Sequence, residues 1–293
     1  MQGSVIKYNL TDSYDAFLRL CNARVQRKQS IFPNNFLTNL RRDSSIFSLP
    51  YFSMLKSIDD YYKRDYQNSK AELGRVLKSC DNLELLPRFH QLRILDDIVL
   101  SNAPQAALQQ INDARQALAQ NQLDAVKDHY QQAISIAPNF AYAVFALAQY
   151  YMNTGDATRA ITFFKKTYQI DKYFISAYRE AYQYYTKQGN FSLMIDILGQ
   201  ALQNGNDYWE VNYNLGVAYA GIDPTKAIPY FEHALALSPK SYLTTIQLGL
   251  AHQTTKNYAK AREYFNRAIE LDPEREDAVN YQKNLDELMR TGR

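Results

Sequence analysis

The chain has 293 residues, of which 46% are apolar, 22% charged and 13% aromatic, so it can bury a large core and is not compositionally disordered. Cys21 and Cys80 are its two cysteines, which excludes a disulfide-stapled scaffold and a cysteine-rich zinc module. The net charge is +3, and residues 1–42 carry seven lysines and arginines against two aspartates. This basic arm is either a solvated helix face or a contact for an acidic partner, a membrane surface or nucleic acid.

Residues 1–106 are predicted to be helical. Apolar residues at helical spacing indicate one helix around residues 14–25, and a proline followed by two asparagines at 33–35 interrupts the pattern. A pair of helices is expected at about residues 50–80. Further helices follow between residues 83 and 120, and the pattern leaves open how they pair.

From residue 107 onward the sequence repeats with a period of about 34 residues. The segment ending at Pro239 has a Leu-Gly pair, then an aromatic residue, an alanine, a phenylalanine and a second alanine: Leu215, Gly216, Tyr219, Ala227, Phe231 and Ala234. The segments ending at Lys172 and Pro273 carry similar residues in the same order. Aligning these ends with Pro138 and Asn206 gives successive spacings of 34, 34, 33 and 34 residues.

This pattern resembles the tetratricopeptide repeat family, whose units of about 34 residues carry L-G-x2-Y, A-x3-F and a closing proline. The resemblance covers roughly residues 107–275, and the helix pair at 50–80 resembles a degenerate unit of the same kind. It implies an all-α fold, a right-handed α-solenoid of helix-turn-helix repeats with a helical N-terminal region. The implied units are residues 107–140, 141–174, 175–208, 209–241 and 242–275, followed by a capping helix and tail at 276–293.

The small residues of the repeat have a packing role. Gly216 and Ala227 are expected where the first and second helices of a unit, helix A and helix B, approach most closely. The unit ending at Asn206 has the bulky Tyr182 and Met194 in these places, so we expect its two helices to splay or to adjust their packing. His252 occupies the aromatic place of its helix A, and we expect it to pack rather than to bind a ligand.

No catalytic, cofactor or metal site is expected, and we predict that the protein is not an enzyme. His90, His129, His233 and His252 have no second ligand at metal spacing. A phosphate-binding glycine loop and a G-x-S-x-G turn are both absent from the sequence. The two cysteines lie on apolar stripes, where a buried and inert thiol is the usual outcome.

The resemblance implies that a partner protein binds on the concave face, which helix A residues line in this family. Many members hold an extended peptide or a helix there, and the apolar share of this lining favours a peptide or an amphipathic helix. The residues expected to line the face are Tyr142, Phe145, Gln149, Met152, Arg179, Gln183, Tyr213, Asn214, Val217, Leu243, Ile246, Gln247 and Leu250.

Some family members hold the C-terminal carboxylate of chaperones in a clamp of lysine, asparagine and arginine. Arg179 and Asn214 stand in matching places here, whereas Gln183 stands where the clamp has asparagine. Leu243 and Gln247 stand where it has lysine and arginine. Because two of the three cations are missing, we do not expect this clamp.

The resemblance therefore implies a non-catalytic scaffold or adaptor for another protein. The alternative is a regulatory or targeting soluble domain of a larger enzyme or membrane-associated assembly. The concave face could instead be covered by the chain's own N-terminal helices or by a second copy. No apolar run approaches the ~20 residues of a membrane span, and nucleic acid is not expected as a partner. A cytoplasmic location is expected, with the periplasm or the soluble part of a membrane-associated protein as the alternative.

Overall fold

A computed structural model describes residues 63–81 and 101–291, together with residues 57, 60, 86, 90, 93, 94 and 98. The chain divides into two compact units, residues 1–76 and residues 77–293. The expected helix at 14–25, the basic arm and the interruption at 33–35 lie outside the described residues.

The described part of the first unit is dominated by helix α4 (Tyr66–Ser79). Leu73 and Val76 are buried, and the hydroxyl oxygens of Ser57 and Ser69 lie 3.0 Å apart. Nη1 of Arg75 pairs with Glu72 Oε1 at 2.8 Å. The last turn of α4 and Cys80 belong to the second unit, where Cys80 is fully buried, as its apolar stripe predicts.

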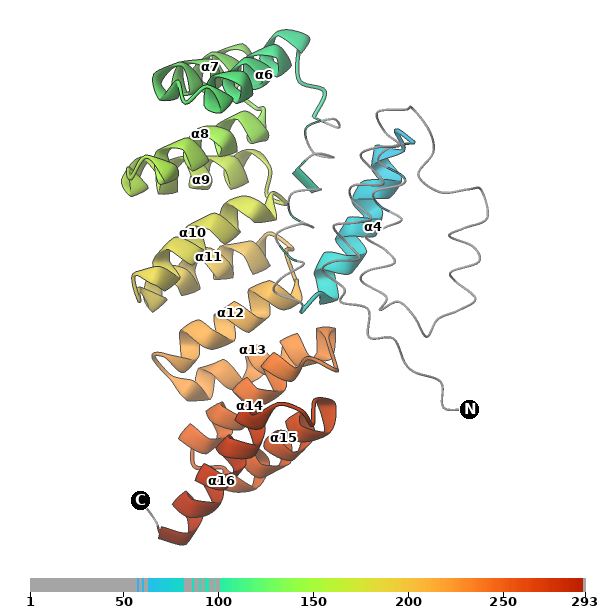
Figure 1. The fold of residues 1–293 in the computed structure, drawn as a ribbon, viewed down its shortest axis with the longest axis vertical. Helices are drawn as coiled ribbons and strands as arrows, with labels where there is room; N and C mark the ends of the chain where they lie inside the picture. Colours follow the sequence, from blue (N-terminus) through green and yellow to red (C-terminus); the bar gives the residue numbers. More distant parts are fainter. Residues whose placement is uncertain are drawn as a thin grey trace. The chain divides into compact units, whose positions relative to one another are not determined.

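The second unit is an array of helix pairs in which each helix contacts the next one along the chain (Figure 1). All elements in the described part of the chain are helices, and those from α6 to α16 stack as an all-α solenoid. The pairs are α6 (Gln105–Ala119) with α7 (Leu123–Ile136), α8 (Ala141–Asn153) with α9 (Ala157–Ile170), α10 (Ile175–Lys187) with α11 (Phe191–Gln203), α12 (Trp209–Ala220) with α13 (Pro224–Leu237), and α14 (Tyr242–Thr254) with α15 (Tyr258–Leu271); α16 (Glu276–Thr291) follows.

The turn from helix A to helix B is built in the same way in successive pairs. Asp156, Asn190, Asp223 and Asn257 each cap the following helix by accepting a hydrogen bond from its first-turn backbone N–H. Such a cap satisfies a backbone donor that the helix leaves unpaired. The residue before the cap takes a positive φ at Gly155, Gly189 and Lys256, with values of 87°, 64° and 61°.

The core of each pair follows the small-residue pattern of the sequence. Ala148, Ala160, Ala227 and Ala261 are fully buried, and phenylalanine rings fill the space between helices. The pair of α10 and α11 departs from this pattern, because fewer of its backbone positions come within contact distance than in the other four pairs. Tyr182 and Met194 are both buried in the places of the small residues, and the looser contact of this pair agrees with the expected change in its packing.

His252 packs in the aromatic place of helix α14, as the sequence predicts. Its ring stacks on Tyr264 with centroids 5.5 Å apart, as Tyr219 stacks on Tyr230 at 5.1 Å in the preceding pair. Neither ring nitrogen of His252 has a hydrogen-bond partner among the described residues. Burial, with a smaller contribution from Lys260, lowers the pKa of His252 below 6.5.

Helix α16 closes the end of the array. Ala278 and Leu285 are buried, and Tyr281 stacks on Phe265 with ring centroids 5.7 Å apart. The opposite face is polar and exposed, which is the arrangement that a terminal helix of a solenoid needs. Within the described residues, no helix is both long enough and apolar enough to cross a bilayer.

Candidate functional site

The thirteen residues expected to line the concave face lie on helices α8, α10, α12 and α14. None of them is fully exposed: eleven are half-buried, and Phe145 and Ile246 are buried. Phe145 is 1% exposed and contacts the rings of Phe164 and Phe174, with centroids 5.7 and 5.0 Å away. Phe145 therefore contributes to the core between α8, α9 and α10.

Two of the half-buried residues, Arg179 and Asn214, lie beside Glu210 on α12, whose carboxylate is buried and which is 4% exposed. Its Oε1 accepts a hydrogen bond of 2.5 Å from the hydroxyl of Tyr182 and lies 3.1 Å from Nε of Arg179, both on α10. Its Oε2 lies 2.9 Å from Nε2 of His90, a residue 120 positions earlier in the chain. Both carboxylate oxygens therefore have partners within the protein.

Asn214 extends this polar cluster by one helical turn. Its amide nitrogen donates to the hydroxyl of Tyr182 at 3.3 Å and to the backbone carbonyl of Glu210 at 2.8 Å. Arg179 and Asn214, which match the chaperone-tail clamp of the family, are thus engaged with groups of the chain itself. We refer to His90, Arg179, Tyr182, Glu210 and Asn214 as the Glu210 cluster.

The charges in the Glu210 cluster compensate one another. Burial acts to raise the pKa of Glu210, but His90, Arg179 and the hydrogen bond from Tyr182 hold it below its ordinary value. Burial raises the pKa of the neighbouring Glu180, although Arg179 and a hydrogen bond with Gln149 act in the opposite direction. Glu210 is thus the ionised carboxylate on which the cluster is built.

His90 belongs to a set of described residues that lie along the array, which we call the inner segment: Asp81, Leu86, His90, Arg93, Ile94 and Ile98. Leu86 and His90 are 1% and 3% exposed, and Ile94 and Ile98 pack against the core shared by α6 to α12. At the other end, Asp81 Oδ2 accepts a hydrogen bond of 3.0 Å from Ser238, the C-cap of α13.

The expected lining residues of α12 and α14 form a second contact. Tyr213 stacks on Trp209 with ring centroids 4.7 Å apart, and burial raises the pKa of Tyr213 although the side chain of Gln247 acts to lower it. Trp209 is fully buried, and its Nε1 donates to Thr244 Oγ1 at 2.9 Å. Tyr213 and Gln247 thus lie side by side, whereas no interaction links them to the Glu210 cluster within the described residues.

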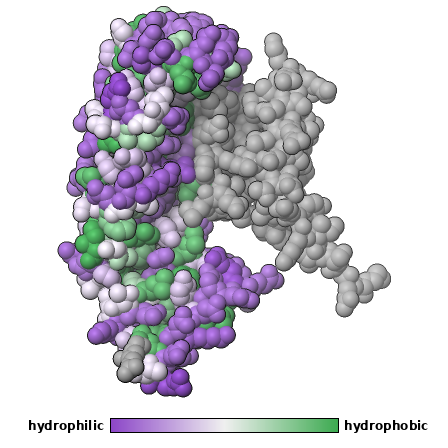
Figure 2. Space-filling view, turned by 60° about the vertical axis from the view of Figure 1, so that its left-hand side comes forward, coloured by the Kyte–Doolittle hydropathy of each residue, from purple (hydrophilic) through white to green (hydrophobic). Residues whose placement is uncertain are grey.

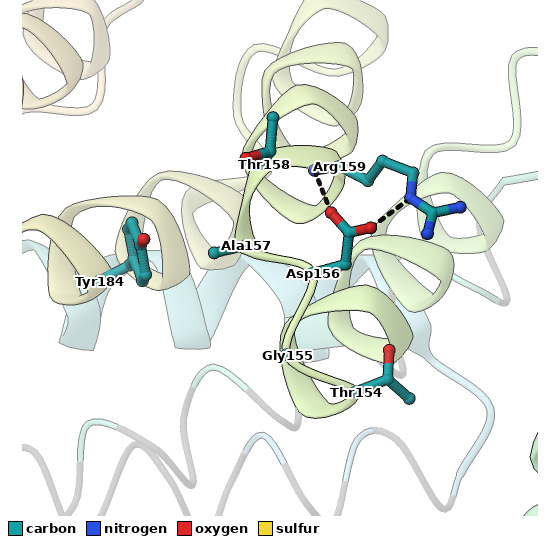
Figure 3. Close-up of a pocket in the computed structure, with 7 residues that line it drawn as sticks. All are labelled: Thr154, Gly155, Asp156, Ala157, Thr158, Arg159 and Tyr184. Atoms are coloured by element: carbon teal, nitrogen blue, oxygen red, sulfur yellow. Dashed lines mark hydrogen bonds and ion pairs between the residues drawn. The ribbon is translucent and has the colours of Figure 1, made fainter.

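An open polar pocket at the turn between α8 and α9 carries no comparable arrangement (Figure 3). Asp156 accepts hydrogen bonds from the backbone nitrogen and from Nε of Arg159, at 2.9 and 2.5 Å. The arginine also lies over the ring of Tyr151, 4.4 Å from its centroid. Both charged groups of the pocket are therefore used in capping α9.

Exposed large apolar side chains are spread over the described helices and turns. Figure 2 shows one face of the array, where hydrophobic colour gathers towards the middle and both ends are mainly hydrophilic. The exposed residues of this kind are Leu118, Leu123, Ile136, Tyr173, Leu193, Ile222 and Met289. No group of three or more histidines, cysteines or carboxylates in the described ranges could hold a metal ion.

His90, Tyr182 and Glu210 are the members of the cluster that are not among the thirteen residues expected to line the concave face. The signal for His90 was its spacing of four residues from Leu86 and from Ile94, which places all three on one helix face. Which helix that face meets is a long-range property, so the local pattern could not have indicated Glu210.

Comparison with known proteins identifies the repeats. Residues 129–162 and 245–275 each match a tetratricopeptide repeat model. Superkiller protein 3 of Schizosaccharomyces pombe is 26% identical over 166 residues, which span 53% of this chain. The match spans 12% of the length of that relative.

Solved structures of two repeat proteins resemble this chain. MamA of Desulfovibrio magneticus RS-1 is 19% identical, with a TM-score of 0.47 over 60% of this chain and 99% of that structure. YrrB, described as a TPR protein with an unusual peptide-binding site, is 18% identical, with a TM-score of 0.49 over 65% of this chain and 97% of that structure.

Proposed function

Because this chain is a protein of the tetratricopeptide repeat family, we propose that it is a non-catalytic scaffold that binds a peptide or helix of a partner protein along its helix A faces. Proteins of this family are generally scaffolds for interactions between proteins. The contact between His90 and Glu210 supports binding along the helix A faces. His90 is a helical residue from outside the repeats, and it contacts side chains of helix A. These faces can therefore accommodate a helix.

The half-buried lining residues support the same proposal. Gln149, Gln183 and Gln247 offer amide groups that both donate and accept hydrogen bonds, while Met152 and Leu250 offer apolar surface. A mixture of this kind fits an amphipathic helix or an extended peptide whose backbone groups also need partners.

The proposal is tested by photo-crosslinking in the native organism. A photoreactive amino acid replaces Gln183 or Leu250 on helix A faces, and Glu232, exposed on α13, in the matched control. We expect crosslinks from the first two positions to one defined segment of another protein, and none to that segment from position 232. Equal crosslinking from all three positions would show that the helix A faces are not the binding surface.

The second candidate is a regulatory or targeting domain of a larger assembly. The small share of the Superkiller protein 3 relative that the match spans favours it, because the matched region is there a small part of a longer chain. A cytoplasmic location is part of the first proposal. Fractionation by size of an extract from the native organism distinguishes the two candidate functions. An assembly subunit elutes at the size of the assembly, whereas a free adaptor elutes near 34 kDa.

A further inference from the structure

The C-terminal end of the array has an apolar core of its own. One cluster of buried residues joins α13 and α14 and consists of Ala227, Phe231, Leu235, Leu248 and Ala251. A separate cluster, which we call the terminal core, joins α14, α15 and α16 and consists of Ile246, Ala261, Phe265, Ala268, Ala278 and Leu285. A repeat at the end of a solenoid is stabilised by a single neighbour, so an end with a separate core can open while the rest stays folded.

His252 lies where these two clusters meet. The buried residues of α15, which are Ala261, Phe265 and Ala268, belong to the terminal core. Tyr264 is the residue of α15 that packs against the cluster of α13 and α14, and it is the ring on which His252 stacks. The stacked pair therefore connects α15 to the part of the array that precedes it.

The imidazole of His252 is buried without a polar partner. The residue is 4% exposed, and both ring nitrogens lack a hydrogen-bond partner among the described residues. A neutral imidazole has one donor and one acceptor, and burying them unpaired already costs free energy. A protonated ring has two donors and a full charge in the same place, so burial lowers the pKa of His252.

The charged groups around His252 are divided between two helices. Glu232 is on α13, whereas Lys260 and Glu263 are on α15, as is the hydroxyl of Tyr264. Lys260 opposes protonation of the imidazole, and the two glutamates favour it. When α15 moves away, the opposite charges of Lys260 and Glu263 leave together, while Glu232 stays near the imidazolium. Opening therefore exposes the protonated ring to water and keeps a carboxylate close to it.

We propose that the last helices are an acid-sensitive end of the array: protonation of His252 releases α15 and α16 from α14, while α6 to α14 remain folded. The released state exposes the terminal core, including Phe265 and the face of α14 at Gly249. At neutral pH the two helices cover this face. The release differs from a general loss of stability in acid because it is confined to one end of the array.

Hydrogen exchange of the full-length chain, measured by mass spectrometry at pH 7.5 and pH 5.5 and corrected for the intrinsic effect of pH, tests the release. We expect the protection of amides in α15 and α16 to be about three- to tenfold lower at pH 5.5, and that of α8 and α9 to be unchanged. About tenfold is the limit, because an imidazole with the ordinary pKa of 6.5 changes from about one-tenth to about nine-tenths protonated over this range. An equal decrease in α8 and α9, or no decrease in α15 and α16, would overturn the proposal.

Two substitutions assign the response to His252. His252→Tyr introduces the residue that stacks in the preceding pair, where Tyr219 contacts Tyr230, and is expected to keep α15 and α16 equally protected at both pH values. The matched control is His233→Tyr, because His233 is an exposed histidine of α13 that pairs with Asp207. This control is expected to respond as the wild type does. A response that persists in His252→Tyr, or one that is lost in His233→Tyr, would refute the role of His252.

The fluorescence of Trp209 locates the boundary of the release. Trp209 is the single tryptophan of the chain, and its buried indole donates a hydrogen bond to Thr244 on α14. Because α14 is expected to stay on α12, the wavelength of maximum emission should be the same at pH 7.5 and pH 5.5. A red shift at pH 5.5 that is absent in His252→Tyr would mean that α14 leaves as well, which contradicts the proposal.

Discussion

Gly216 on α12 lies directly against the ring of Phe231 on α13. A Cβ atom at Gly216 would be 2.5 Å from that ring, and Phe231 is fully buried. The same relationship recurs between Gly249 and Phe265 in the next pair. The glycine of the repeat is therefore required by the ring that occupies its side-chain space.

Gly216→Ala is expected to lower the free energy of unfolding by about 1 kcal/mol. The gain in helix propensity from glycine to alanine is at most ~1 kcal/mol, and overpacking against Phe231 costs ~1–3 kcal/mol. The matched control is Gly199→Ala on α11, where no atom lies within 4 Å of the added Cβ. That variant is expected to gain ~0.5–1 kcal/mol, and urea titration of both variants checks the opposite signs.

Lys256→Gly is expected to stabilise the protein by ~1 kcal/mol. Lys256 has a φ of 61°, in the place where Gly155 and Gly189 stand in earlier units, and a residue with a Cβ atom in this conformation is strained. The control is Lys260→Gly, inside helix α15, which is expected to lose ~1 kcal/mol. A lower melting temperature for Lys256→Gly would contradict this account of the turn.

The free energy of unfolding is expected to decrease as the pH is lowered below 6.5, partly because of His252. Its pKa is lowered in the folded protein, so the unfolded chain binds the proton more readily and protonation favours unfolding. This contribution is fully present above pH 6.5 and is lost as the pH decreases towards the folded pKa. Besides Lys260, the groups that face the imidazole are Tyr264, Glu232 and Glu263.

Replacing His252 by tyrosine tests this explanation. His252→Tyr is expected to reduce the loss of stability between pH 7.5 and pH 5.5 in urea titrations. The reverse change, Tyr219→His, places an imidazole in the equivalent position of α12 and is expected to enlarge that loss. An unchanged pH dependence in both variants would show that this position does not contribute.

Two truncated chains test what the inner segment contributes to the stability of the repeats. A fragment of residues 77–293 keeps His90 with Glu210 and is expected to be monomeric and to melt in one transition. A fragment of residues 101–293 lacks the inner segment, so it exposes apolar surface and leaves Glu210 and Arg179 without His90. We expect it to aggregate or to melt at least 5 °C lower in calorimetry, and identical melting of the two fragments would refute this.

The regular part of this fold could be predicted from the sequence because its determinants are local. The places of Gly216, Ala227 and Phe231 recur every 33 or 34 residues, and each repeat contacts its neighbours in the same way. The same rule located the misfit of Tyr182 and Met194. The burial of Phe145 could not be predicted from the repeating pattern, because it depends on the rings of Phe164 and Phe174 outside α8.

The Glu210 cluster escaped prediction for a related reason. Helical periodicity places Glu210 and Arg179 on helix A faces, and Arg179 is among the residues expected to line the concave face. Helical periodicity carries no information on contacts with a residue that lies outside the repeats. The pairing of His90 with Glu210 depends on a contact between a residue that precedes the repeats and one 120 positions later, which no repeating pattern encodes.

The separation of 120 positions between His90 and Glu210 also sets an order of events during synthesis. Ribosomes add about 5–20 residues per second, so His90 emerges about 6 to 24 seconds before its carboxylate partner. Helix pairs that need only their neighbours can form in this interval, whereas a contact that closes so long a loop forms late. The imidazole of His90 therefore lacks its carboxylate partner on the nascent chain until α12 has been made.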